Sequence, residues 1–97
     1  MFEIKNTIKN TECIGLTMVK LTQEKKYEIL LIVLEKGQSF PPHSSLRNTL
    51  LIMLEGNVKF NINSERYTLG KNQIFEFPAK INHDVLANGN SKFLIIR

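Results

Sequence analysis

The sequence has 97 residues, of which 42% are hydrophobic and 23% charged, and its formal net charge is +4. A chain of this length forms one domain with a hydrophobic core and is too short for two, and its composition excludes a disordered or collagen-like chain. Ten of the 13 basic residues are lysines dispersed along the chain, without a basic stripe interleaved with aromatic residues. We therefore expect a single domain over residues 1–97, with a solvated charged surface and no nucleic-acid partner.

The cysteine content and the hydropathy pattern indicate a compartment. Cys13 is the only cysteine, which excludes an internal disulfide and fits a reducing environment. No histidine lies near it in the sequence, so we expect an unreactive thiol rather than a nucleophile. Residues 1–5 lack the apolar run of a signal peptide, and no segment approaches the ~20 apolar residues of a membrane span. The prediction is a cytoplasmic protein without a membrane partner.

The N-terminal third predicts two strands. Ile14, Leu16 and Met18 alternate with polar residues in the first strand, which leads through a turn at residues 22–26 into a second strand at residues 27–35. The second strand is apolar on both faces and rich in Ile and Leu. Its length, its β-branched content and the glycine that follows favour a buried strand over a helix.

Two later segments, residues 50–55 and 93–96, are also apolar on both faces. A sheet with one solvated face needs only one apolar face, so the second face of these strands must be covered by another sheet or by a subunit. We therefore expect a homodimer, formed by the two-sided strands of the N-terminal half and residues 93–96.

The middle of the chain predicts a β-hairpin. Val58, Phe60 and Ile62 alternate with polar residues, Asn63-Ser64 marks a tight turn, and the alternation resumes afterwards. Turn and breaker residues recur every eight to fifteen positions along the chain, at Gly37, Pro41, Pro42, Gly56, Gly70, Asn72, Pro78 and residues 88–90. This spacing is typical of a small all-β barrel or sandwich.

The only two histidines, His43 and His83, lie at the borders of predicted strands. His43 follows Pro41-Pro42, whose fixed φ angles make the segment stiff and extended. His83 opens a predicted strand over residues 83–87. Either histidine alone also fits a structural role, with its ring bound to a backbone carbonyl or to a hydroxyl such as that of Ser45.

Over about residues 27–96 the chain resembles a small single-domain cupin of the RmlC-like type. The first cupin motif is Gly, five residues, His, one residue, His, three or four residues, Glu, six residues and Gly, and the second is Gly, five residues, Pro, one residue, Gly, two residues and His. The sequence keeps every spacing, with Gly37, His43, Ser45, Thr49 and Gly56 in the first motif and Asn72, Pro78, Lys80 and His83 in the second, and with Asn88 beyond. The resemblance implies an all-β fold, the cupin-type double-stranded β-helix, which is a jelly-roll barrel of antiparallel strands.

The resemblance also implies a shared site at the barrel mouth. In metal-binding cupins the motif side chains converge on one divalent ion, and the corresponding set here is His43, Ser45, Thr49 and His83. Hydroxyls are poorer ligands than imidazole or carboxylate, so the expected cofactor is none, or a weakly bound Zn, Ni, Fe or Mn ion held by His43 and His83. Asp84 follows His83 directly and would point to the opposite face of a strand.

Other side chains have two possible roles. Arg47 either meets an anionic ligand at the barrel mouth or is a solvated surface residue. Phe40, Phe75 and Phe77 either line an apolar pocket or belong to the core. For Glu76, two residues before Pro78, the sequence does not determine on which side of the chain the side chain lies.

Three functions remain open at this point. The first is a small-molecule-binding cupin whose pocket is framed by His43, Ser45, Arg47, Thr49 and His83. The second is a metal-dependent enzyme of the isomerase, dioxygenase or decarboxylase type, acting on a small organic acid or sugar derivative, although no catalytic residue can be named. The third is a non-catalytic oligomeric module. Fold alone does not choose among these functions. The missing carboxylate and the missing second imidazole of the motif favour the first function over the metal-dependent enzyme.

Overall fold

The computed structural model describes residues 2–97, except for the side chains of residues 41–43. Within this part of the chain, one short helix, α1 (Thr7–Asn10), precedes nine strands. The strands are β1 (Leu16–Lys20), β2 (Ile29–Leu34), β3 (Ser39–His43), β4 (Thr49–Glu55), β5 (Asn57–Ile62), β6 (Glu65–Gly70), β7 (Ile74–Phe77), β8 (His83–Ala87) and β9 (Ser91–Ile96). No helix in residues 2–97 is long and apolar enough to cross a bilayer.

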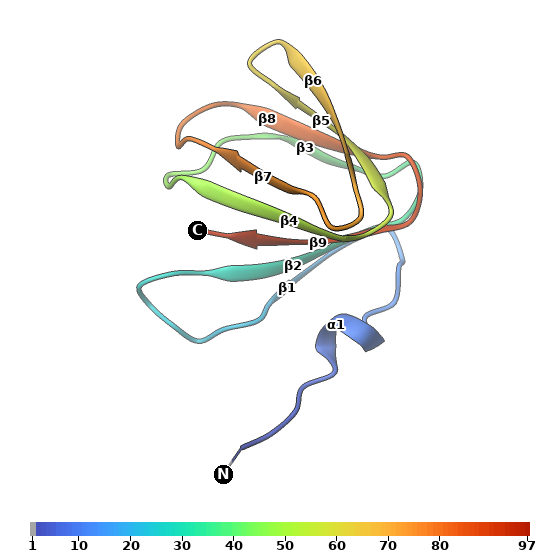
Figure 1. Ribbon diagram of the computed structural model, residues 1–97, viewed down its shortest axis with the longest axis vertical. Helices are drawn as coiled ribbons and strands as arrows, with labels where there is room; N and C mark the ends of the chain where they lie inside the picture. Colours follow the sequence, from blue (N-terminus) through green and yellow to red (C-terminus); the bar gives the residue numbers. More distant parts are fainter. Residues whose placement is uncertain (1) are drawn as a thin grey trace.

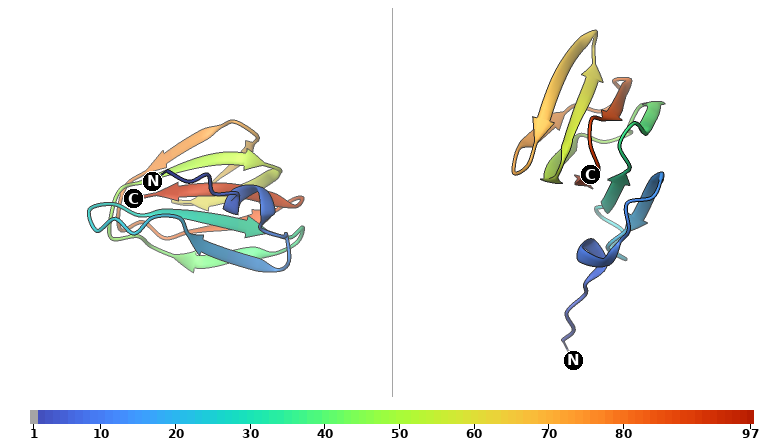
Figure 2. Two further views of the ribbon diagram at one scale, coloured as in Figure 1. Left: turned by 90° about the horizontal axis from the view of Figure 1, so that it is seen from below. Right: turned by 90° about the vertical axis from the view of Figure 1, so that its right-hand side faces the viewer.

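The strands form two antiparallel sheets that face each other (Figures 1 and 2). The five-stranded sheet has the order β1-β2-β9-β4-β7, and the four-stranded sheet has the order β3-β8-β5-β6. Apart from the consecutive pairs β1–β2 and β5–β6, neighbouring strands in both sheets come from distant parts of the chain, as in a jelly roll. The predicted all-β fold of antiparallel strands is confirmed, and so is the cupin-type arrangement that the motif spacing implied.

The predicted hairpin is formed by β5 and β6. Asn63 and Ser64 at its tip have φ angles of 51° and 61°. Two consecutive residues with positive φ are typical of the tight turns whose twist matches that of the flanking strands. Val58, Phe60 and Ile62 of β5 are buried, so the period-two pattern in the sequence identified the face that points into the barrel.

The segment with two prolines, predicted as stiff and extended, is part of strand β3. This strand lies at the edge of its sheet and pairs only with β8. An edge strand tolerates proline because one side of its backbone has no partner strand. The register shifts between Phe40 and His43, as expected where prolines interrupt the ladder.

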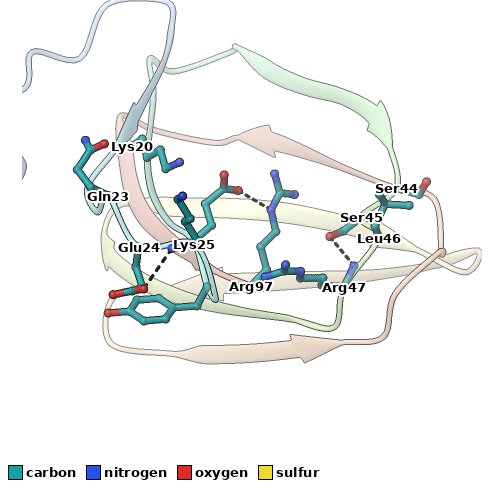
Figure 3. A pocket seen from close by; sticks show the side chains of 11 residues that line it. Lys20, Gln23, Glu24, Lys25, Ser44, Ser45, Leu46, Arg47 and Arg97 are labelled. Carbon is teal, nitrogen blue, oxygen red and sulfur yellow. Dashed lines mark hydrogen bonds and ion pairs between the residues drawn. The ribbon is translucent and has the colours of Figure 1, made fainter.

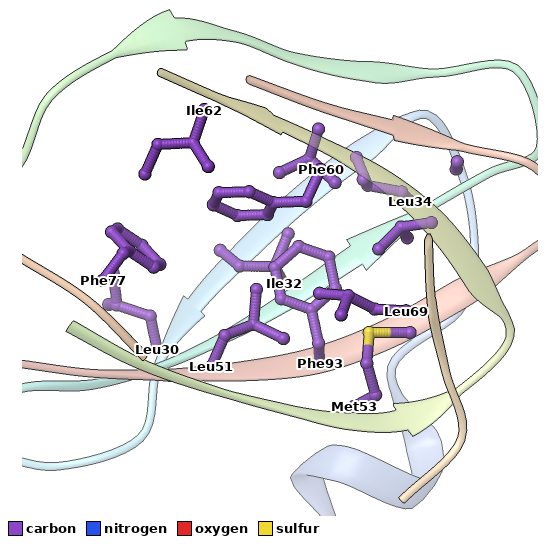
Figure 4. Close-up of a cluster of buried hydrophobic side chains, with 13 residues drawn as sticks. Leu30, Ile32, Leu34, Leu51, Met53, Phe60, Ile62, Leu69, Phe77 and Phe93 are labelled. Carbon is purple, nitrogen blue, oxygen red and sulfur yellow. The ribbon is translucent and has the colours of Figure 1, made fainter. Parts of the chain in front are cut away.

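The core lies between the two sheets (Figure 4). Phe60, Phe93, Leu34, Leu51 and Met53 are each at most 1% exposed. Three rings, those of Phe60, Phe75 and Phe77, contact one another with centroid distances of 4.9 to 5.9 Å. In Figure 4, Phe77 lies on the side of Leu30 and Ile62, and Met53 lies on the side of Leu34 and Leu69.

The two ends of the barrel are bordered by different loops (Figure 1). We call the end bordered by residues 21–28, 44–48 and 78–82 the open end, because cavities are found there. We call the end bordered by residues 35–38, Gly56, 71–73 and 88–90 the closed end.

The outer face of β2 is covered by the chain itself. Leu31 and Val33 are fully buried although neither belongs to the core between the sheets. The preceding N-terminal segment is tied to the same sheet, since the Cys13 thiol donates to the Leu34 carbonyl at 3.1 Å and the Lys92 ammonium donates to the Ile8 carbonyl at 2.7 Å. The second face of β2 is therefore covered within the chain, and the predicted homodimer stays a prediction.

Candidate functional site

A cavity of about 270 Å³ lies inside the barrel at the open end. Strands of both sheets line it, mainly with Leu30, Ile32, Phe40, Phe60, Phe77, Val85, Phe93 and Ile95. Its polar lining consists of Ser44, Ser45, Thr49, His83 and Arg97. An apolar wall with a few convergent polar groups is the usual composition of a small-molecule site. We refer to this space as the inner cavity.

His83 is the first residue of β8 and lies at the inner cavity. Its side chain is only 5% exposed, and its Nδ1–H donates to the Ile81 carbonyl at 2.9 Å. The ring stacks on Phe60, with a centroid distance of 5.3 Å and an interplanar angle of 13°, and it also contacts Phe77 at 4.6 Å. The backbone carbonyl and the two rings therefore fix the orientation of the imidazole at the cavity wall.

His43 is placed through its backbone. It is the register partner of His83 between β3 and β8, so the two motif positions that are distant in the sequence lie directly opposite each other in one sheet. The side chain of His43 lies outside the described part of the structure. Its predicted role as a ligand or a metal donor therefore stays a prediction.

Ser45 and Thr49 both border the inner cavity, and the hydroxyl of each also forms a hydrogen bond within the loop between them. The Arg47 N–H donates to the Ser45 hydroxyl at 3.2 Å, and the Thr49 hydroxyl donates to the Arg47 carbonyl at 3.1 Å. Both side chains are at least 95% buried. A further backbone bond joins the Lys80 N–H to the Ser45 carbonyl at 2.7 Å, so the two motif loops hold each other at the open end.

Arg47 lies beside the inner cavity rather than in it. Its side chain is exposed, and its Nη1 donates to the Lys26 carbonyl at 3.0 Å. It lines a second, wider cavity of about 660 Å³ at the same end of the barrel, shown in Figure 3. We refer to this space as the outer cavity.

Arg97 lines both cavities, and the sequence reasoning missed it. Phe93 and Ile95 line the inner cavity from the same strand, so Arg97 continues their period-two alternation beyond β9. Extending that alternation by one step would have identified Arg97 as a residue of the site. The strand predicted from the sequence ends at Ile96, with Arg97 as the residue that follows its last position.

Glu76 and Asp84 do not join the site. Glu76 is exposed, and it alternates with Phe75 and Phe77, whose side chains contact the core. Asp84 accepts a hydrogen bond of 2.6 Å from the Asn61 amide, on the face of the sheet opposite to His83. The expectation for Asp84 is confirmed, and the structure places Glu76 outside the barrel.

The four positions at which the cupin motifs carry glycine share one backbone conformation. Gly37 and Gly56 have φ angles of 87° and 84°, and Asn72 and Lys80, which replace the other two glycines, have φ angles of 70° and 66°. Asparagine tolerates the left-handed region, whereas lysine adopts it at a cost. Positive φ angles therefore occur at all four positions, at the two that keep glycine and at the two that do not.

The donor set of the site does not fit a tightly held divalent metal. Among the described residues, no group of three or more His, Cys, Asp or Glu side chains is close enough to share an ion. His83 is the one strong donor among the described side chains of the motif set, and the hydroxyls of Ser45 and Thr49 are engaged in the loop around Arg47. Two imidazoles and two neutral hydroxyls would form a weak site, and we derive no chemical step through a metal.

The chain belongs to the cupin domain family, whose family model matches residues 30–96. A conserved protein of unknown function from Streptococcus pyogenes is 27% identical, with a TM-score of 0.78 over 84% of this chain and 72% of that one. A cupin superfamily protein from Desulfitobacterium hafniense is 19% identical, with a TM-score of 0.88 over 99% of this chain and 90% of that one. An RmlC-like cupin from Desulfovibrio desulfuricans is 18% identical, with a TM-score of 0.85 over 99% and 95%. No curated protein matches the chain significantly.

Proposed function

We propose that this cupin domain binds a small organic molecule in the inner cavity. The single observation that supports this best is the partly open space of about 270 Å³ inside the barrel, with an apolar wall and polar groups at its open end. A volume of about 270 Å³ corresponds to about nine water-sized groups, given ~30 Å³ for each in a liquid. The space therefore suits a molecule, or a part of one, with about nine non-hydrogen atoms.

The described residues favour binding over catalysis. They bring one imidazole, His83, and two buried hydroxyls to the cavity wall. His83 donates Nδ1–H to a backbone carbonyl, and its ring lies against Phe60 and Phe77, so the imidazole has a fixed place in the cavity wall. An acid–base pair would need a second titratable group in the cavity, and His43 is the candidate that the register of β3 and β8 offers.

A ligand screen by thermal unfolding tests the proposal. A true ligand stabilises the folded protein by RT ln(1 + [L]/Kd), which is about 2.7 kcal/mol at a hundredfold excess over Kd. The matched control is Val85→Phe, which fills the cavity from its wall, because Val85 lines it. We expect a stabilising ligand for the wild-type protein and none for Val85→Phe. A flat response of the wild-type protein across acids, sugars and aromatic compounds would favour the non-catalytic module instead.

We also propose that the chain forms a homodimer through the outer face of β4, β9 and β7. Leu50 pairs with Ile96, Ile52 with Leu94, and Ile52 also with Ile74, so apolar residues adjoin across three strands. Ile74 is 62% exposed, and an apolar patch of this kind on a small protein marks an interaction site.

Light scattering on two matched variants tests the dimer. Ile74→Glu introduces a charge in the patch, and Leu86→Glu introduces the same charge at an exposed position of the other sheet. We expect a dimer for the wild-type protein and for Leu86→Glu, and a monomer for Ile74→Glu. A wild-type monomer at micromolar concentration would refute the dimer.

A further inference from the structure

The inner and outer cavities are adjoining parts of one site. Ser44, Ser45 and Arg97 line both of them. The inner cavity is mostly apolar, whereas the outer one is lined largely by charged and polar side chains from residues 20–28 and 44–47 (Figure 3). A ligand that occupies both would have an apolar part inside the barrel and a polar part at the open end.

The charge of the outer cavity indicates the sign of that polar part. Four cationic side chains line it, those of Lys20, Lys25, Arg47 and Arg97, against the two carboxylates of Glu24 and Glu28. The excess of positive charge favours an anion, and a partly enclosed site strengthens the attraction relative to open water.

Arg97 is held in place with part of its guanidinium unused. Its backbone pairs with Glu28 in both directions, and its Nε donates to the Glu28 carboxylate at 2.9 Å. Both side chains are about one-third exposed. The two Nη nitrogens of Arg97 donate to no described residue, so they form the fork that binds a carboxylate in a bidentate manner.

Arg47 approaches the same space from the loop between β3 and β4. The hydrogen bond from its Nη1 to the Lys26 carbonyl holds the guanidinium at the outer cavity. Its backbone N–H donates to the Ser45 hydroxyl, which fixes the backbone of the loop. Figure 3 shows Arg47 and Arg97 entering from different elements of the fold. Two anchored guanidinium groups in one cavity are a better carboxylate site than dispersed lysines.

We propose that the ligand is a small monocarboxylate, with an aromatic or branched aliphatic body in the inner cavity and its carboxylate on Arg97 and Arg47. This inference rests on the proposed function, and it adds the chemical class of the ligand. The aromatic rings of Phe40, Phe60 and Phe77 line the space for the body. The ring of benzoate, which is the part that would occupy the inner cavity, is smaller than the space of about 270 Å³ and fits within it.

The test compares carboxylates with their neutral amides by isothermal titration calorimetry. The probes are benzoate, phenylacetate and 3-methylbutanoate, each paired with its amide. The variants are Arg97→Gln, Arg47→Gln and, as the matched control, Arg66→Gln, whose side chain binds Asn61 on the outside of the barrel. Because Arg47 is exposed, Arg47→Gln should fold even if Arg97→Gln does not.

We expect at least one carboxylate to bind more tightly than its amide. Arg97→Gln and Arg47→Gln should each weaken that binding about tenfold or more, the effect of one charge-assisted hydrogen bond, and Arg66→Gln should leave it unchanged. Equal affinity for amide and carboxylate would overturn the inference while the proposed function stands. Carboxylate binding that persists in Val85→Phe would also overturn it, because the body would then lie elsewhere. No binding by any probe of either kind would also overturn the inference, whereas the proposed function falls only if the broader thermal-unfolding screen gives a flat response.

Discussion

At the closed end of the barrel the polar groups bind one another, whereas at the open end several of them face a cavity. Ser91, at the closed end, is 1% exposed, and its hydroxyl donates to the Gly89 carbonyl at 2.8 Å and accepts from the Asn57 N–H at 3.1 Å. Asn88 donates its amide to that of Asn57 at 2.6 Å. A network whose donors and acceptors are all used rigidifies a structure and leaves little for a ligand to bind.

The open end is built from the same strands, but several of its polar side chains line a cavity. Its motif loops are joined by the bond from Lys80 to Ser45, yet His83 and Arg97 still line unfilled space. The comparison indicates that the motif glycines and asparagines at the closed end maintain the fold. The motif positions at the open end, His83, Ser45 and Thr49 among them, line the inner cavity.

The largest effect should come from a methyl group at the closed end. A Cβ at Gly56 would overlap the Asn90 carbonyl and the Ser91 hydroxyl and would lie 2.7 Å from Ser91 Cα, at a backbone φ of +84°. We expect Gly56→Ala to lower the free energy of unfolding by at least about 3 kcal/mol or to prevent folding. The control is Gly89→Ala, which meets nothing within 4 Å. Equal urea midpoints for the two variants would contradict this account of the closed end.

The next largest effect should come from enlarging a buried valine, because the loss of stability should differ between a valine in the packed core and one that lines the cavity. Val58 is fully buried and does not line the inner cavity, whereas Val85 does. Val58→Leu should lose about 1–3 kcal/mol through overpacking, and Val85→Leu should lose less than about 0.5 kcal/mol because the cavity accepts the added group. Urea unfolding of both variants measures the difference. A larger loss for Val85→Leu would mean that the space at the open end is already filled.

A smaller effect is expected where lysine replaces a motif glycine. Lys80 has a φ of 66°, which costs a non-glycine residue about 1 kcal/mol, and glycine would relieve this cost while adding some entropy to the unfolded chain. Lys80→Gly should therefore raise the free energy of unfolding by about 0.5 kcal/mol. Ala79→Gly, one position earlier, should lower it. Destabilisation by both variants would show that the loop is not strained.

The smallest effect concerns the hairpin of β5 and β6. The hydroxyl of Tyr67 donates to the Glu65 carboxylate at 2.6 Å, and this hydrogen bond, with lesser contributions from desolvation and the carboxylate charge, raises the pKa of Tyr67 above its ordinary 10.0. In a Tyr27→Phe background, Tyr67 is the only tyrosine. Glu65→Gln should move its absorbance titration to lower pH. An unchanged titration would show that the bond is absent in solution.

Much of the fold follows from local patterns in the sequence. Alternation identified the inward face of β5, and two-sided apolar content identified β2, β4 and β9 as buried strands. Strand β7 was not predicted, because four residues are too few to show a period. That omission explains why Glu76 had no predicted side.

The site was harder to predict than the fold, because it depends on contacts between distant segments. The motif spacing led to His83, Ser45 and Thr49, which the structure brings to one cavity. Arg97 had no motif to mark it. Its role depends on Glu28, which is far from it in the sequence and beside it only after β2 and β9 pair.

Mapping ligand contacts by NMR tests the central claim most directly. Amide and methyl shifts are followed while the tightest ligand from the screen is added to the wild-type protein. We predict shift changes at the residues of the open end, such as Val85, His83 and Arg97, with Gly56 and Ser91 at the closed end unchanged. Changes confined to the outer face of β4 and β9, or spread over the closed end, would contradict the claim that the inner cavity is the binding site.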